Sequence, residues 1–266
     1  MKIVSSRQNR LVARYRAAAR GDARDVALLD GLHLVSEAVE AGVRIRHVAV
    51  KSDAMTITEV GALIERLTHS GVDVVSVSPS VMNALSAVRS SSSIVALVDR
   101  PVADVDRVFD APRPLVVIAA DVQDPGNLGA IVRVAEAGGA SGVIAAGASA
   151  DPFGWKALRG SMGSALRLPI GSRSEIARAA DDARQHGCRI FSTVPRQGRS
   201  VFDCDFRGPG AIFIGSEGPG LPQAVIESSD ERVTIPMQPP VESLNAAVTA
   251  ALIVYEARRQ RMKKTQ

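Results

Sequence analysis

The sequence predicts an α/β protein of two domains, the larger of which contains a mainly parallel sheet. Short apolar runs alternate with segments of helical periodicity, the pattern of strands that are covered on both faces. Residues 101–114 interrupt this alternation with three prolines and several charges, as a connection between domains does. The 266 residues are 46% hydrophobic, which is enough for the chain to fold around real cores without disulfides.

The first domain is predicted over residues 1–100 as a small α/β unit. It begins with a short basic helix near residues 9–23. A second helix is expected at 32–39, where Leu32, Val35 and Val39 share one face. The elements that follow alternate in pattern, with strands at 47–50, 72–77 and 94–98 and helices at 58–69 and 80–88.

The second domain is predicted over residues 115–266, after the connection at 101–114. Its apolar runs predict strands at 115–120, 142–145, 189–194, 211–215 and 232–235, with a weaker one near 166–170 and helices between several of them. In parallel sheets, ligands bind at the carboxyl ends of the strands. Three blocks rich in glycine, proline and polar residues lie at such ends, at 121–133, 215–220 and 235–245. The sequence therefore predicts a ligand site there.

Composition narrows the class of protein. Cys188 and Cys204 fit no disulfide framework or zinc pattern, which indicates a reducing cytoplasm. No apolar run approaches the roughly 18 residues that span a bilayer, so membrane insertion is not expected. The net charge is +4, but basic residues crowd both ends: Arg7, Arg10, Arg14, Arg16, Arg20 and Arg24 at the start, and Arg258, Arg259, Arg261, Lys263 and Lys264 at the end. Charge alone leaves nucleic-acid binding and an ordinary solvated surface equally open.

The first block leads into a helix whose apolar positions fall on one side, at about 100° per residue. Gly129 and Arg133 fall on the other side, so Arg133 projects near a face that Gly129 leaves bare for a ligand. Taken alone, Arg133 is more simply a surface residue paired with Glu136. Asn127, at the start of the helix, is as easily a helix cap.

The other two blocks are ambiguous when each is taken alone. The second block lacks the spacing of a dinucleotide-binding loop and the lysine of a P-loop, which disfavours a nucleotide phosphate cradle. Glu217 in it is equally well a turn residue or a ligand contact. In the third block, Ser243 is expected to cap the final helix, and not to act as a nucleophile, because no His or Lys lies near it in sequence. The apolar positions of that helix are Leu244, Ala247, Val248, Ala251, Leu252 and Tyr255.

Together the three blocks resemble the motifs of the SpoU (TrmH-like) branch of the SPOUT RNA methyltransferases. Residues 125–133 (PGNLGAIVR) are similar to motif 1, residues 214–221 (IGSEGPGL) to motif 2, and residues 235–245 (IPM through SLN) to motif 3. This resemblance covers about residues 115–261. Upstream, residues 28–38 resemble a substrate-binding domain similar to ribosomal protein L30e, which many members carry.

The resemblance implies a specific reaction and a specific cofactor. Members transfer a methyl group from S-adenosylmethionine to a ribose 2′-hydroxyl of RNA, need no metal, form homodimers and fold the catalytic domain as a trefoil knot. The implied cofactor site consists of Thr193, Gly215, Ile235, Met237 and Leu244.

The resemblance also assigns the central role in catalysis to Arg133. The residues that would support it as a polar shell are Asn127, Glu217, Ser243 and Asn245. Arginine stays protonated in proteins, so we expect Arg133 to steady the developing alkoxide and the substrate phosphate, and not to act as a simple base.

Ribosomal RNA, and 23S ribosomal RNA first, is the expected substrate, because tRNA-specific members typically lack the upstream domain. Two alternatives stay open: a tRNA 2′-O-methyltransferase, and a non-catalytic RNA-binding or ribosome-assembly protein. The presence of all five polar motif residues argues against the loss of catalysis.

Overall fold

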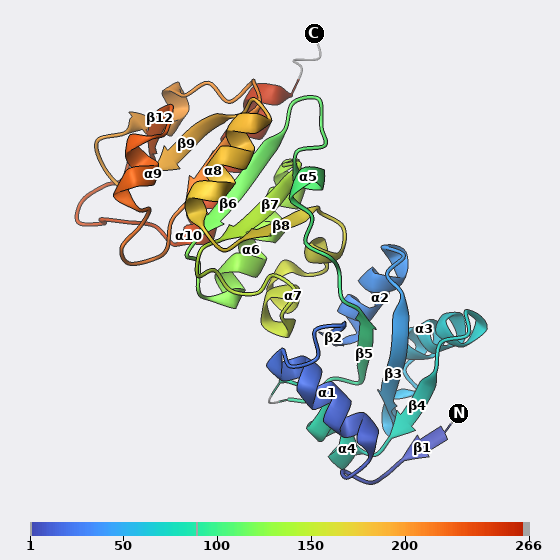
Figure 1. Cartoon of the computed structure of the whole chain (residues 1–266). Coiled ribbons are helices and arrows are strands. Elements are labelled where there is room, and N and C mark those ends of the chain that lie inside the picture. Colours follow the sequence, from blue (N-terminus) through green and yellow to red (C-terminus); the bar gives the residue numbers. More distant parts are fainter. Residues whose placement is uncertain (1, 89, 263–266) are drawn as a thin grey trace. The chain divides into compact units, whose positions relative to one another are not determined.

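The computed structural model describes residues 2–88 and 90–262, and these form two compact units (Figure 1). Unit 1 contains the described residues up to Pro101 together with Phe153–Arg167. Unit 2 contains Val102–Pro152 and the described residues from Leu168 onward. The basic residues Lys263 and Lys264 lie outside the described part of the chain.

Unit 1 contains a five-stranded mixed sheet with the strand order β1-β4-β3-β5-β2. Its strands are β1 (Lys2–Val4), β2 (Val26–Asp30), β3 (Ile45–Lys51), β4 (Val74–Val77) and β5 (Ile94–Asp99). β5 runs antiparallel to both β2 and β3, whereas β4 is parallel to β1 and β3. The sequence patterns predicted β3, β4 and β5 but neither β1 nor β2.

Helices cover both faces of this sheet. On one face, α1 (Arg10–Arg20) and α4 (Pro79–Leu85) share a core with alternate strand residues such as Val95 and Leu97. On the other face lie α2 (Leu32–Glu40) and α3 (Thr58–His69), whose bounds are close to the predicted ones. Successive residues of the inner strands point to opposite faces and are buried on both, so the sheet separates two layers of core.

One helix of unit 1 comes from much later in the chain. The segment Phe153–Arg167 contains α7 (Trp155–Ser161), which contacts β2, and Trp155 packs against the core that α1 and α4 cover. The Arg167 guanidinium pairs with Glu37 of α2. This helix was not singled out by the sequence pattern, and the predicted division at residues 100 and 115 differs from the observed units. The apolar side chains of this segment find their burial in unit 1.

Unit 2 contains a seven-stranded sheet in which every pairing is parallel, with the order β10-β12-β9-β11-β6-β7-β8. Its strands are β6 (Leu115–Ala120), β7 (Gly142–Ala146), β8 (Ile170–Arg173), β9 (Arg189–Thr193), β10 (Arg199–Ser200), β11 (Gly210–Ile214) and β12 (Glu231–Thr234). This confirms the predicted α/β class with a parallel sheet. The weak strand at 166–170 is displaced: residues 164–166 form a 3-10 turn, and the polar edge strand β8 begins where the prediction ended.

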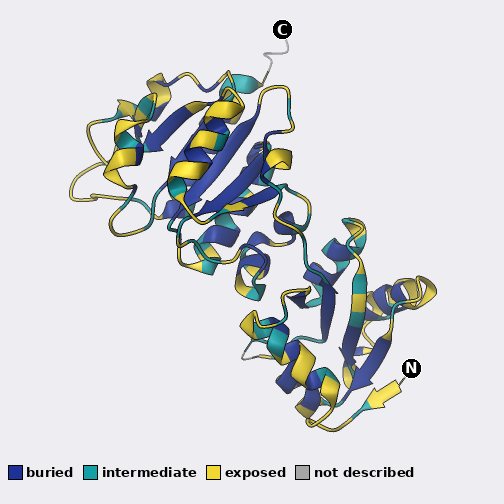
Figure 2. Ribbon diagram, viewed as in Figure 1, coloured by how far each residue is buried: buried dark blue, intermediate teal, exposed yellow. Residues whose placement is uncertain are grey.

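The helices of unit 2 also lie on both faces of its sheet, and the central strands between them are buried (Figure 2). One layer consists of α5 (Val105–Val108), α8 (Ile176–Gln185) and α9 (Gln223–Glu227), which share a single core. The other consists of α6 (Pro125–Gly138) and α10 (Ala246–Arg261), which pack against each other. At Gly138 a Cβ atom would lie 2.1 Å from Cγ1 of Val254, so glycine is what permits this close helix contact.

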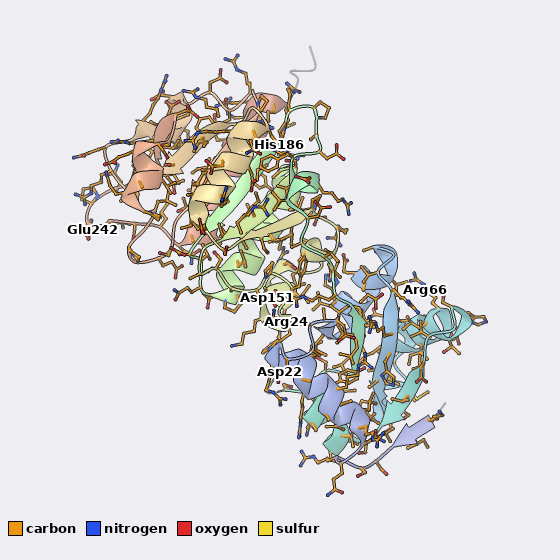
Figure 3. All side chains as sticks on the ribbon, in the orientation of Figure 1. Asp22, Arg24, Arg66, Asp151, His186 and Glu242 are labelled. Atoms are coloured by element: carbon orange, nitrogen blue, oxygen red, sulfur yellow. The ribbon has the colours of Figure 1, made fainter. Side chains whose placement is uncertain are left out.

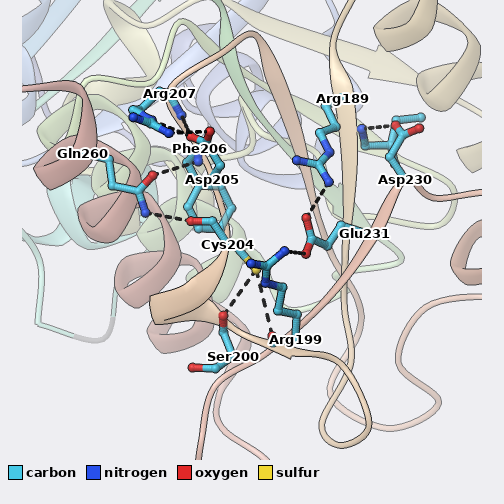
Figure 4. Close-up of polar contacts among 11 residues, drawn as sticks. Arg189, Arg199, Ser200, Cys204, Asp205, Phe206, Arg207, Asp230, Glu231 and Gln260 are labelled. Atoms are coloured by element: carbon cyan, nitrogen blue, oxygen red, sulfur yellow. Dashed lines mark hydrogen bonds and ion pairs between the residues drawn. The ribbon is translucent and has the colours of Figure 1, made fainter.

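Charged side chains hold the edge of this sheet together (Figure 4). Glu231 of β12 accepts from Arg189 of β9 at 2.6 Å and from Arg199 of β10 at 3.3 Å. One carboxylate of β12 thereby joins β9 on one side and β10 on the other.

Cys204 lies close to this cluster. Burial raises the pKa of its thiol to about 11, so this group is not ionised near neutral pH and is a poor nucleophile.

Tyr15 fixes α1 onto the sheet of unit 1. Its ring is fully buried, and its hydroxyl lies 3.0 Å from Nδ1 of His47 and 3.2 Å from the carbonyl oxygen of the same residue. Burial lowers the pKa of His47, Arg14 lowers it further, and Asp73 opposes the shift.

We expect unit 1 to lose stability as the pH falls below about 6.5, the ordinary pKa of histidine. A histidine whose pKa is lower in the folded state binds more protons when unfolded, so the free energy of unfolding decreases as the pH drops toward the folded-state value. Thermal denaturation followed by circular dichroism across this range measures the effect. His47→Gln should flatten the dependence, whereas His69→Gln, at an exposed position of α3, should preserve it. A wild-type slope in His47→Gln would contradict the assignment.

Candidate active site

A cavity of about 310 Å³ opens at the carboxyl ends of β12, β9 and β11, which are neighbours in the sheet of unit 2. This volume lies at the lower end of the range for small-molecule sites. The wall combines the ends of these strands with the loop that precedes α10 and with the first turns of α10 itself.

The residues expected to bind a cofactor all line this cavity: Thr193, Gly215, Ile235, Met237 and Leu244. Three of the expected polar residues, Glu217, Ser243 and Asn245, also line it. The Thr193 hydroxyl donates to the carbonyl oxygen of Phe213 at 2.8 Å, so its proton is already used in joining β9 to β11.

The second block forms a tight turn that shapes one wall of the cavity. Ser216 and Gly220 form an isolated antiparallel bridge, and Gly220 has a φ of +71° that favours glycine. A Cβ atom on Gly215 would lie 2.5 Å from the carbonyl carbon of Gly220 and 2.6 Å from the amide nitrogen of Leu221. Backbone therefore touches backbone here, and only glycine fits.

Gly215→Ala is expected to weaken cofactor binding by about 5- to 150-fold, because overpacking of about 1–3 kcal/mol must displace the backbone that lines the cavity. Isothermal titration with S-adenosylmethionine measures this. Gly208→Ala is a matched control, since a Cβ atom there meets nothing within 4 Å. Equal affinities of the two variants would show that the turn does not shape the site.

A hydrogen-bonded triangle of Asn127, Glu217 and Asn245 joins the three sequence blocks at the rim of the cavity. The side-chain amides of Asn127 and Asn245 both donate to Oε1 of Glu217, at 2.7 and 2.6 Å. The Asn245 amide also lies 3.0 Å from Oδ1 of Asn127. One carboxylate oxygen thus organises residues that are 90 and 28 positions away in sequence.

The residues that cap α6 and α10 differ from the predicted ones. Asp124, not Asn127, caps α6 through its carboxylate, which frees the Asn127 amide for Glu217. Asn245, not Ser243, caps α10, because Oδ1 of Asn245 accepts from the backbone amides of Ala247 and Val248. Asn245 therefore uses its oxygen for the helix and its nitrogen for the triangle, while Ser243 is exposed at the cavity.

Arg133 is exposed on α6, as the helical spacing predicted. Among the described residues its guanidinium has no hydrogen-bond or ion-pair partner, so the simpler alternative of a pair with Glu136 is wrong. It does not line the cavity or join the triangle. Gly129 is buried together with Val132, so the expected bare face for a ligand is absent at that position of the described helix.

Three lining residues of α10 were not predicted: Ala246, Thr249 and Ile253. They recur at helical spacing, on the side that faces the core. The predicted apolar face of this helix is in fact largely exposed: Val248, Leu252 and Tyr255 are 46%, 45% and 50% accessible, whereas Ala250, Ile253 and Val254 are buried. The helix is apolar on both sides, and a single sequence does not indicate which side faces its own core.

The loops at the cavity mouth carry opposite charges. Arg196, after β9, lies 3.7 Å from Glu242, which Figure 3 labels in the loop that precedes α10. Both side chains are well exposed, so this ion pair contributes little to stability. Among the residues that the structure describes, no group of His, Cys, Asp and Glu side chains is arranged to hold a metal ion. Likewise, no described helix is long and apolar enough to cross a membrane.

Comparison with known families gives two matches along the chain. Residues 114–255 match the model of the SpoU rRNA Methylase family. Residues 19–96 match that of an MRM3-like substrate binding domain. The first match covers unit 2 across all three motifs, and the second covers most of unit 1.

Individual relatives match this chain over most of its length. An uncharacterized tRNA/rRNA methyltransferase of Synechocystis sp. is 32% identical over 97% of this chain and 93% of its own length. The 23S rRNA (guanosine(2553)-2′-O)-methyltransferase RlmP of Bacillus subtilis is 28% identical over 87% and 88%. The crystal structure of the SpoU methyltransferase AviRb from Streptomyces viridochromogenes, in complex with AdoMet, superposes with a TM-score of 0.84 at 30% identity and covers 96% of this chain and 99% of that one.

The three motifs converge on one cavity of a parallel sheet, and the family match spans the same residues. The chain therefore belongs to the SpoU rRNA methylase family.

Proposed function

We propose that this protein is an S-adenosylmethionine-dependent RNA 2′-O-ribose methyltransferase that acts on 23S ribosomal RNA. The observation that carries the proposal is the cavity at the ends of β9, β11 and β12, with the triangle of Asn127, Glu217 and Asn245 at its rim. Family membership and the 23S rRNA methyltransferases among the relatives support the same reaction.

The cavity fits the proposed cofactor in size and in the chemistry of its wall. Backbone groups of Gly215, Ile235 and Met237 would bind the polar edges of the adenosyl part, and Leu244 and Ile253 offer apolar surface to its ring. When bound, S-adenosylmethionine supplies a methyl group that is already activated by its sulfonium. The protein's task is then to align the ribose oxygen and to favour loss of its proton.

Arg133 is the residue that we assign to the substrate. Its side chain is exposed on α6, where a phosphate or a developing alkoxide of the RNA can approach it. Fixed positive charge at that position lowers the energy of the oxyanion without accepting a proton. The triangle is a positioning device, because it fixes the start of α6 to the start of α10, and Ser243 lies beside it at the cavity.

The direct test is methyl transfer from labelled S-adenosylmethionine to unmodified 23S ribosomal RNA and, in parallel, to unmodified tRNA. We expect label in the ribosomal RNA, at a nucleotide whose 2′-O-methyl group becomes resistant to alkaline hydrolysis. Label in tRNA alone would identify the tRNA alternative. Binding of both RNAs without label in either would identify the non-catalytic alternative.

A homodimer is part of the proposal. The exposed stripe of Val248, Leu252 and Tyr255 on α10 is apolar, continuous along one helix face, and adjacent to the α10 residues that line the cavity. A second copy of this chain would cover it. We also propose a cytoplasmic location, where ribosomal RNA is modified, and a trefoil knot in which the segment after β12 passes through a preceding loop.

Leu252→Glu is expected to convert the dimer into a monomer, because it places a charge at the centre of the apolar stripe. Light scattering coupled to size-exclusion chromatography measures the mass. Arg178→Glu changes an exposed position of α8, outside the stripe, and should remain dimeric. A monomeric wild-type protein at micromolar concentration would refute the proposed dimer.

A further inference from the structure

The positive charge of this chain is concentrated at its start. Residues 1–25 contain seven lysines and arginines and two aspartates, a formal charge of +5, whereas residues 26–266 contain the other 25 basic and 26 acidic residues, a charge of −1. The net charge of +4 therefore comes entirely from the segment around α1. The family match in this unit begins only at residue 19, so most of α1 precedes the matched domain.

α1 presents these charges from a fixed platform. Asn9 caps its first turn, and Gly21 ends it in the left-handed conformation with a φ of +81°. Val12, Tyr15 and Ala18 are buried on one side. The opposite side is exposed, and at about 100° per residue its small alanines Ala13 and Ala17 separate two pairs of arginines: Arg16 and Arg20 on one flank, Arg10 and Arg14 on the other.

Only two of these arginines are neutralised by carboxylates within unit 1. Arg14 pairs with Asp25 at 3.2 Å and Arg20 with Asp22 at 2.7 Å. Arg7 and Arg16 donate only to backbone carbonyl groups of α4 residues, at 3.1 and 3.3 Å, so each keeps its full positive charge.

Two further arginines, Arg10 and Arg24, have no hydrogen-bond or ion-pair partner among the described residues. Figure 3 labels Arg24 beside Asp22, just beyond the end of α1.

The arginines at the other end of the chain behave differently. Arg259 pairs with Glu256 at 2.7 Å. Arg261 donates to the carbonyl oxygens of Phe206 and Arg113 at 2.7 and 3.0 Å, and Arg258 donates to that of Ala137. Arg259 is thereby neutralised by a carboxylate and Arg261 is held by several backbone carbonyls, whereas Arg258 makes a single hydrogen bond of 3.4 Å.

We propose that the exposed arginine surface of α1 and of the residues on either side of it, defined by Arg7, Arg10, Arg16 and Arg24, binds the phosphate backbone of the RNA substrate. The inference rests on the proposed function and names the surface by which unit 1 holds the RNA. Uncompensated guanidinium groups on a rigid helix favour phosphate, and the small alanines between them allow a backbone to approach closely. Because the contacts are to phosphate, they supply affinity and not sequence choice.

The test compares two double variants of equal charge in the full-length protein. Arg10→Gln with Arg24→Gln removes two free charges from this surface, one at the start of α1 and one beyond its end. Arg44→Gln with Arg66→Gln removes two exposed arginines of the same unit that also lack partners among the described residues. For each, the affinity for an unmodified 23S ribosomal RNA transcript is measured by filter binding across a range of salt concentrations, and cofactor affinity is measured by calorimetry.

We expect the α1 variant to reduce the slope of log K against log salt by about 1.4, which corresponds to about 25-fold weaker binding at 0.1 M salt. The control should keep the wild-type slope, and both should bind the cofactor as the wild type does. Equal loss of RNA affinity in the two variants, or no loss in either, would overturn the role of α1 while methyl transfer by the wild type upheld the proposed function. A wild type that bound no RNA would overturn both.

Discussion

Arg133→Ala is expected to lower the rate of methyl transfer by at least about 10²–10³-fold, the usual cost of losing one group that stabilises an oxyanion. The structure gives a reason to expect that this variant loses catalysis but keeps its fold. Arg133 is exposed, and no described residue depends on it for a hydrogen bond or an ion pair, so its removal should leave fold and cofactor affinity intact. Single-turnover transfer of labelled methyl to 23S ribosomal RNA measures the rate, and calorimetry measures the affinity for S-adenosylmethionine.

Two further variants separate geometry from charge. Arg133→Lys keeps the positive charge but loses the planar fork, so we expect it to recover only a small part of the rate. Arg178→Ala removes an equally exposed arginine from α8 and should be indistinguishable from the wild type. Retention of full activity in Arg133→Ala would remove Arg133 from the reaction.

Asn127→Asp is the second substitution with a large expected effect. The Asn127 amide donates to Oε1 of Glu217 at 2.7 Å, so an aspartate would set two carboxylates against each other at that distance. The start of α6 should then move away from the second block. We expect a loss of about 10²-fold in kcat/KM, because displacements of about 1 Å have that effect on aligned reactants.

The matched rescue is Asn127→Asp combined with Glu217→Gln, which removes one of the two charges. Glu217→Gln alone keeps an acceptor oxygen for both amides and should retain most of the activity. We expect the double variant to recover at least tenfold over Asn127→Asp. Failure of this rescue, with the fold intact by circular dichroism, would show that the triangle does not act through the charge of Glu217.

The sequence predicted the site better than it predicted the units. Residues that are far apart in the chain, such as Asn127 and Glu217, could be placed together because each follows the carboxyl end of a strand in one parallel sheet. The hydrogen bonds between them could not be predicted, because the spacing does not indicate which side chain caps a helix. Asp124 and Asn245 took the capping roles that the pattern gave to Asn127 and Ser243.

Elements were missed or misjudged where the hydrophobic pattern of the sequence is weak or where it does not indicate which face of the element is buried. β2 is a short strand whose residues are all buried, and it precedes a glycine turn, so its five residues gave no alternation. β8 is polar because it lies at the edge of the sheet. The two apolar sides of α10 could not be ranked, since both are apolar although one meets the core of unit 2 and the other is exposed.

The helix α7 has a practical consequence for dividing this protein into parts. It is encoded between β7 and β8 of unit 2, yet its residues Ala157 and Leu158 are fully buried within unit 1. A fragment that begins after residue 101 would therefore carry an orphaned apolar helix, and one that ends there would expose the surface of β2 that α7 covers. An exchange of substrate domains between relatives should therefore replace two separate segments together, residues 1–101 and 153–167.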